Sequence, residues 1–173
     1  MPVVDQCICA GTVTNIPRRQ TMAPASLTVL ILAFCLAVPF ASAKAAGDLT
    51  QQEPVEIRVA LGSEKNALRF FPETISLETG KLYRLVLSNP SPQKHYFSSA
   101  GMAQAVFTRK VQVNGIDGKV IAEVKGEVRE IEVYPGGTAE WWFVPVKTGS
   151  FNDLRCTIPG HGEGGMIGSI NIR

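Results

Sequence analysis

The chain has 173 residues, which is enough for one domain and a leader segment. Its 17 Lys and Arg against 15 Asp and Glu give a formal net charge of +2. No basic run or stripe accompanies that charge, so the sequence excludes a nucleic-acid-binding surface. An apolar fraction of 45% is ordinary for a globular protein.

Residues 1–45 have the features of an export signal peptide. Arg18-Arg19 supply positive charge ahead of an apolar run from Ser26 to Phe40, which is short for a membrane span. The small-residue sequence Ala41-Ser42-Ala43 follows, and Ala43-Lys44-Ala45 is a second candidate cleavage signal. We therefore expect cleavage near one of these sites and export to the bacterial periplasm. An uncleaved signal anchor is the alternative, and it would be the chain's one attachment to a membrane.

Two features of this leader leave alternatives open. Met22 stands just before the apolar run and is an alternative start, in which case residues 1–21 are an over-long start. Arg18-Arg19 also suggest twin-arginine export of a prefolded protein, although the flanking residues fit that signal poorly. After the leader, residues 46–53 form a polar linker and residues 54–173 the folded domain.

The folded domain contains many short stretches typical of strands, separated by Gly and Pro turns. Residues 98–109 are Ala-rich and are the one stretch that favours a short helix. This pattern predicts an all-β fold, an antiparallel β-sandwich with at most a short helical insertion. The expected strands are 56–61, 68–71, 74–78, 81–88, 111–113, 120–124, 129–133, 139–146 and 166–172, with a further strand leading into Cys156.

Two sequence features indicate which side chains fill the core. In the stretch 81–88, alternation places Tyr83, Leu85 and Leu87 on one face, and that face is the better core candidate. Farther along the chain, Trp141 or Trp142 anchors the core, because adjacent residues of a strand face opposite sides of the sheet.

The stretch from Cys156 to Met166 (CTIPGHGEGGM) holds a thiolate, the imidazole of His161 and a thioether within eleven residues. The chain has one other imidazole, His95. Two imidazoles, one thiolate and a weak axial thioether form the donor set of a mononuclear blue-copper site. The sulfur donors favour Cu(I), whereas imidazole binds both oxidation states. The set therefore suits an ion that changes charge with little movement.

The residues between these donors allow a compact loop. Pro159-Gly160 favours a turn that brings His161 back beside Cys156, and the three glycines before Met166 let that residue reach the same ion. If the leader is removed, Cys156 is the one remaining thiol, so no internal disulfide can form. A lone thiol in an oxidising compartment is a liability unless it is occupied.

The pattern Cys156-x4-His161-x4-Met166, followed by Gly168 and a last strand, resembles the C-terminal ligand loop of the cupredoxin family, which includes azurin, plastocyanin and auracyanin. The run Thr148–Cys156 resembles the strand before that loop, and the likeness covers roughly residues 54–173. The resemblance implies a Greek-key β-sandwich. It also implies one type 1 copper ion bound by His95, Cys156, His161 and, axially, Met166.

His95 follows a strand that ends in Asn89-Pro90, which resembles the position of the first copper ligand in cupredoxins. The next residue departs from the family pattern. Azurin and plastocyanin have an Asn there whose amide supports the thiolate loop, whereas this chain has Tyr96. We therefore expect one hydrogen bond of the outer coordination shell to be missing or replaced.

Other interpretations of the same residues fit less well. A Cys–His catalytic pair would need an orienting Asn or Asp, and none is evidently placed for it. Gly160, Gly162 and Gly165 match a dinucleotide-binding fingerprint, but too few residues follow for the helix and strand that such a site requires. Structural zinc is the more serious rival, although a thioether is an unusual zinc ligand.

The resemblance implies a soluble, non-enzymatic electron carrier. Its partner would be a c-type cytochrome, an oxidase or a reductase docking near His161. The alternative is a periplasmic protein that binds or delivers copper without redox turnover, but the chain lacks the Met-rich or His-rich tracts common in such proteins. A copper enzyme is disfavoured, because two His cannot build a trinuclear cluster and a four-ligand site leaves no open position for substrate.

Overall fold

The structure is a computed structural model that describes residues 47–115 and 117–173. The signal peptide predicted for residues 1–45 and the alternative start at Met22 lie outside these residues. Within the predicted linker, residues Leu49–Gln51 form a single 3-10 turn (η1) capped by the Asp48 side chain. In the described ranges, no helix is both long enough and apolar enough to cross a membrane.

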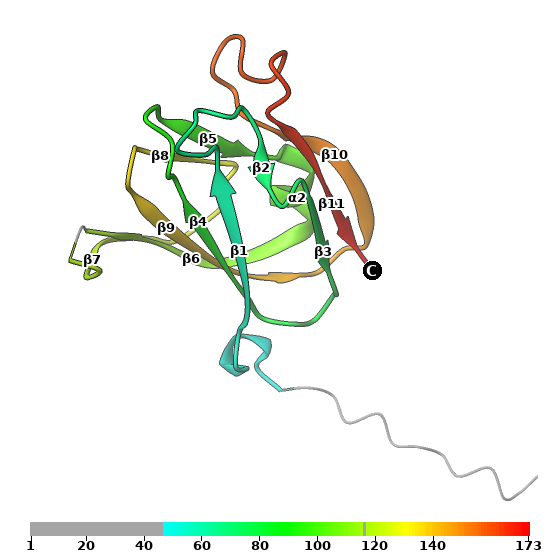
Figure 1. Cartoon of the computed structure of the whole chain (residues 1–173). Coiled ribbons are helices and arrows are strands. Elements are labelled where there is room, and N and C mark those ends of the chain that lie inside the picture. Colours follow the sequence, from blue (N-terminus) through cyan, green and yellow to red (C-terminus); the bar gives the residue numbers. More distant parts are fainter. Residues whose placement is uncertain (1–46, 116) are drawn as a thin grey trace, which may run out of the picture. The chain divides into compact units, whose positions relative to one another are not determined.

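The described residues form two β-sheets that face each other across one core (Figure 1). The first sheet has the order β2-β1-β4-β9-β6-β7, with bounds Phe70–Phe71, Val55–Leu61, Tyr83–Ser88, Thr138–Pro145, Val106–Asn114 and Val120–Val124. The second has the order β3-β11-β10-β5-β8, with bounds Thr74–Leu77, Ile167–Ile172, Gly149–Arg155, His95–Ser98 and Glu130–Val133. The predicted all-β sandwich is confirmed.

The sheets are mixed rather than wholly antiparallel. β1 pairs with β4 in parallel, and β3 pairs with β11 in parallel, whereas the other pairings are antiparallel. After β2 the chain crosses to the second sheet through β3 before it returns as β4, so β4 runs in the same direction as β1. Alternation in the sequence reports which face of a strand is buried and not the direction of its neighbours, so it did not reveal these parallel pairs.

The predicted helical stretch, residues 98–109, divides into a short helix and a strand. The helix α2 spans Ala100–Ala105, and Ser99 caps it by accepting a hydrogen bond from the Met102 N–H at 3.2 Å. The remainder of the stretch begins β6 and pairs with β9. Tertiary pairing therefore overrides the local preference after Ala105.

Trp141, and not Trp142, anchors the core. Its indole is fully buried, lies edge-on to Phe97 and Phe143 with ring centroids 6.5 Å and 5.3 Å away, and donates a hydrogen bond to Thr108 Oγ1 at 3.1 Å. The neighbouring Trp142 is half-buried on the outer face of the sheet. The core face predicted for 81–88 is confirmed, since Tyr83, Leu85 and Leu87 are buried.

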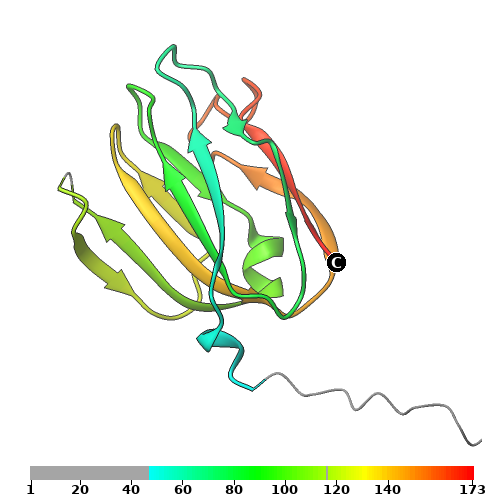
Figure 2. The same ribbon diagram turned by 60° about the horizontal axis from the view of Figure 1, so that its bottom comes forward.

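Both ends of the described chain lie at one end of the sandwich. Gln52 Nε2 donates to the carbonyl of Gly80 at 2.9 Å, and the N–H of Arg173 donates to the carbonyl of Leu77 at 3.0 Å. Figure 2 shows the loop between β10 and β11 at the opposite end. That loop carries Cys156, His161 and Met166.

Candidate metal centre

Two strands and one loop bring the predicted ligands together. His95 is the first residue of β5, and Cys156 directly follows β10. Ser98 and Arg155 pair across these two strands, so Cys156 enters the site beside β5. His161 lies in the loop that leads on to β11.

Backbone hydrogen bonds close the loop from Cys156 to Met166. The His161 N–H donates to the Ile158 carbonyl at 3.0 Å, and Gly160 adopts a φ of 84°, which confirms the predicted turn at Pro159-Gly160. The Met166 N–H donates to the His161 carbonyl at 2.9 Å, and the Cys156 N–H donates to the Met166 carbonyl at 3.0 Å. The position of each ligand is therefore fixed by its neighbours in the loop.

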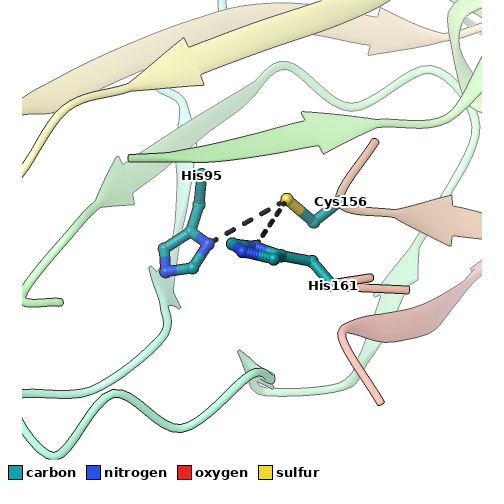
Figure 3. A group of neighbouring side chains, drawn as sticks. All are labelled: His95, Cys156 and His161. Atoms are coloured by element: carbon teal, nitrogen blue, oxygen red, sulfur yellow. Dashed lines mark hydrogen bonds between the residues drawn. The ribbon is translucent and has the colours of Figure 1, made fainter. Parts of the chain in front are cut away.

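The ring nitrogens of both histidines point at the thiol (Figure 3). His161 Nδ1 lies 3.5 Å from Cys156 Sγ, and His95 Nδ1 lies 3.9 Å from it. The ligand atoms of the three residues all lie within 4.8 Å of one another. His95 and Cys156 are fully buried, whereas His161 retains 9% exposure and is the predicted ligand that reaches the surface.

These separations fit a single metal ion. Bonds of about 2.0 Å to nitrogen and 2.3 Å to sulfur, at tetrahedral or trigonal angles, place the two ligand atoms about 3.5–3.7 Å apart. Both observed N–S separations lie near this range. Burial, and next the charge of His161, lower the pKa of His95 below its ordinary value of 6.5, which keeps its imidazole neutral and able to coordinate.

Met166 is fully buried at the end of the same loop. Its backbone bonds to Cys156 and His161 place it next to two of the three clustered ligands. Its role as a weak axial ligand remains a prediction.

The Tyr96 backbone supplies the thiol with a hydrogen-bond donor. The Tyr96 N–H donates to Cys156 Sγ at 3.4 Å. Its half-buried ring lies on the other face of β5, where the Lys94 ammonium sits 5.9 Å from the ring centroid. The side chain that replaces the family's Asn therefore projects away from the ligands.

Ser91 is a residue of the site that the sequence did not single out. It is buried, and its Oγ lies 3.0 Å from His95 Nε2, on the side of the ring opposite the thiol. Its position in the turn Asn89-Pro90-Ser91-Pro92 gave no signal of this contact.

No family model matches the chain. Over 108 residues it is 31% identical to the copper-resistant cuproprotein CopI of Rubrivivax gelatinosus, and the match covers 62% of this chain and 62% of that protein. The chain thus matches less than two thirds of the length of this curated relative.

Two solved structures show the same fold. A multicopper oxidase from Campylobacter jejuni is 16% identical, with a TM-score of 0.52 over 70% of this chain and 30% of the oxidase. The copper-containing nitrite reductase of Thermus scotoductus SA-01 is 17% identical, with a TM-score of 0.51 over 70% of this chain and 32% of the reductase. The chain has a cupredoxin-like fold, and the donors at the end of its sandwich fit a single copper ion.

Proposed function

We propose that this protein is a type 1 copper electron carrier and not an enzyme. The observation that carries the proposal is the buried cluster of His95, Cys156 and His161, whose ligand atoms lie within 4.8 Å of one another. Its donors suit both Cu(I) and Cu(II). Two of the ligands lie on a loop closed by backbone hydrogen bonds, so a one-electron change requires little rearrangement of the protein.

The surroundings of the cluster favour electron transfer over catalysis. His95 and Cys156 are fully buried, which leaves little room for a substrate. The oxidase and the reductase are much larger than this chain, which covers 30% and 32% of them, so their activities do not carry over. The whole chain contains two His, too few for a second copper cluster of the oxidase kind.

The surface around His161 suits a redox partner. Pro159 and Gly160 are exposed in the turn directly before this residue, and Ile167, which follows Met166, retains 55% exposure. An exposed turn of small apolar residues beside His161 lets a partner approach the site closely. We propose that a c-type cytochrome, an oxidase or a reductase docks here. The proposed periplasmic location depends on the export signal predicted for residues 1–45.

Copper binding or delivery without redox turnover is the second candidate. It is favoured by the match to a protein named copper-resistant cuproprotein CopI. The two functions differ in what the site does after it binds copper. A carrier holds both oxidation states in one geometry, whereas a delivery protein releases the ion to an acceptor.

A spectrum of the purified protein with added Cu(II) is the direct test. We expect one equivalent of copper, an intense visible band, and the electron paramagnetic resonance signal of one Cu(II) ion. Reductant should bleach the band, and oxidant should restore it without loss of copper. Copper that leaves on reduction would favour delivery. A protein that binds zinc and gives no visible band under oxidising conditions would refute the copper carrier.

The substitution Met166→Leu tests the predicted axial ligand. We expect the visible band to remain, because the three clustered donors are unchanged. The reduction potential should rise by on the order of 60 mV, which is a tenfold change in the Cu(I) to Cu(II) preference for one electron. The thioether is only a weak donor, so its softness counts for less than the loss of one donor out of four, and that loss disfavours the more highly charged ion. Voltammetry measures the shift, and an unchanged potential would mean that the thioether does not reach the site.

The substitution Tyr96→Asn tests the outward orientation of the Tyr96 ring. The donor to Cys156 Sγ is the backbone N–H of residue 96, which the substitution retains. We therefore expect a reduction potential close to that of the wild type and a visible band at the same wavelength. A potential shift as large as that of Met166→Leu would show that the side chain at position 96 acts on the thiolate.

A further inference from the structure

A chain of hydrogen bonds leads from His95 to the protein surface. The hydroxyl of Ser91 lies 3.0 Å from His95 Nε2, and it donates to Asn66 Oδ1 at 3.3 Å. Ser91 Oγ also accepts a hydrogen bond from the N–H of Gln93 at 3.1 Å. Ser91 and His95 are buried, whereas Asn66 is exposed.

The number of hydrogen bonds at Ser91 assigns the proton on His95. A serine hydroxyl has one donor and two acceptor lone pairs. Its hydrogen goes to Asn66, and one lone pair is occupied by Gln93. The remaining lone pair faces His95 Nε2, so that nitrogen must carry the hydrogen. In a neutral imidazole, Nδ1 then has a free lone pair, and it is Nδ1 that faces Cys156 Sγ.

We propose that Ser91 is a positioning residue that holds His95 in its metal-binding tautomer, and that Asn66 holds the Ser91 hydroxyl in the orientation this requires. The inference rests on the proposed copper site, and it adds the residues that prepare one ligand before the ion arrives. Outer hydrogen bonds of this kind commonly contribute tenfold to a hundredfold in metal affinity.

The backbone around the ring supports this role. Gly62 has a φ of 80°, and a Cβ at this position would lie 2.9 Å from His95 Nε2 and 2.9 Å from Ser91 Cβ. The chain therefore passes directly over the edge of the imidazole and confines it against the hydroxyl. The turn that carries Ser91 is also anchored, because Asn89 Oδ1 accepts the Ser91 N–H at 2.9 Å and Asn89 Nδ2 donates to the Val133 carbonyl at 2.8 Å.

Asn66 is in an unusual backbone conformation that allows a selective test. Its φ is 59°, a region that Gly adopts without strain and that Asn tolerates. Substitution Asn66→Gly keeps the backbone and removes the acceptor for Ser91. Substitution Asn66→Asp keeps oxygen acceptors at the same place. Comparison of the two variants separates the effect of the hydrogen bond to Ser91 from any effect of the loop conformation.

The experiment measures the tautomer of His95 in the metal-free protein by ¹⁵N NMR, at a pH where the imidazole is neutral. We expect a single Nε2–H tautomer in the wild type and in Asn66→Asp. In Ser91→Ala and Asn66→Gly we expect a mixture of tautomers, because Nε2 loses its acceptor or the hydroxyl is free to turn. Copper affinity, measured by competition with a chelator, should fall tenfold to a hundredfold in Ser91→Ala and less in Asn66→Gly.

The outcomes separate this inference from the proposed function. A wild type with mixed tautomers overturns the inference even if the protein turns blue with copper. Ser91→Ala with a single tautomer and wild-type copper affinity also overturns it. If Ser91→Ala does not fold, the Asn66→Gly tautomer decides the matter. The inference is supported if the wild type and Asn66→Asp show a single Nε2–H tautomer and Asn66→Gly does not. This holds even if no visible band forms with copper, because the missing band would refute only the copper carrier.

Discussion

A Cys156→Ser protein is expected to lose the visible band completely and to retain Cu(I) much more weakly than the wild type. Cys156 Sγ is the atom on which both His Nδ1 atoms and the Tyr96 N–H converge. Its thiolate is the soft donor that gives such sites their charge-transfer band, whereas the serine hydroxyl is hard and weakly acidic. Titration with Cu(II) followed by absorbance, and competition with a Cu(I) chelator, measure the two losses.

The histidine variants are the matched controls. His161→Ala removes a ligand that reaches the surface, so added imidazole should enter the gap and restore the band. His95→Ala removes a ligand that is fully buried, so the same rescue should require more imidazole. A Cys156→Ser protein that still turned blue with Cu(II) would overturn the assignment of Cys156 as a ligand.

The substitution Trp141→Ala is expected to give the largest loss of stability of any single change in the core. It removes the largest of the fully buried side chains, its edge contacts with Phe97 and Phe143, and its bond to Thr108. Truncation of a buried Trp costs about 3–5 kcal/mol, a large share of the roughly 5–15 kcal/mol by which domains are stable. Urea unfolding of the metal-free protein measures the loss.

Trp142→Ala is the control, because it changes the same residue type on the outer face of the same strand. Its ring is half-buried between the Arg84 guanidinium, 5.6 Å from the ring centroid, and the Lys110 ammonium, 5.1 Å away. Such contacts at exposed sites contribute about 0.5–1 kcal/mol each. We expect the free energy of unfolding to fall by less than half as much as in Trp141→Ala. Equal losses would contradict the assignment of Trp141 as the core anchor.

The sequence predicted the ligand loop well because its structure is local. The donors Cys156 and His161 are five residues apart, and Pro159-Gly160 specifies the turn between them. His95 could be assigned as the second imidazole ligand for a different reason, because the chain contains no His besides His95 and His161. Its place after a strand that ends in Asn89-Pro90, together with the scarcity of imidazoles, identified it.

The support around His95 could not be predicted in the same way. Asn66 and Ser91 lie 25 positions apart, and they meet because β1 and β4 pair in parallel and bring the ends of both strands together. Alternation along a strand carries no information about this pairing. The orientation of the Tyr96 ring was also undetermined, because the face that a strand residue occupies depends on which neighbours bury it.

The position of the two ends of the described chain determines how the folded domain can be attached to something else. Gln52 and Arg173 both bond to the turn at residues 77–80, at the far end of the sandwich from the ligand loop. A tag, a tether or a second domain joined at either end therefore leaves His161 facing outward. If the protein were attached to an electrode through those ends, the site would face dissolved partners. It would also lie about 20 Å from the conducting surface, which is the length of a six-residue strand.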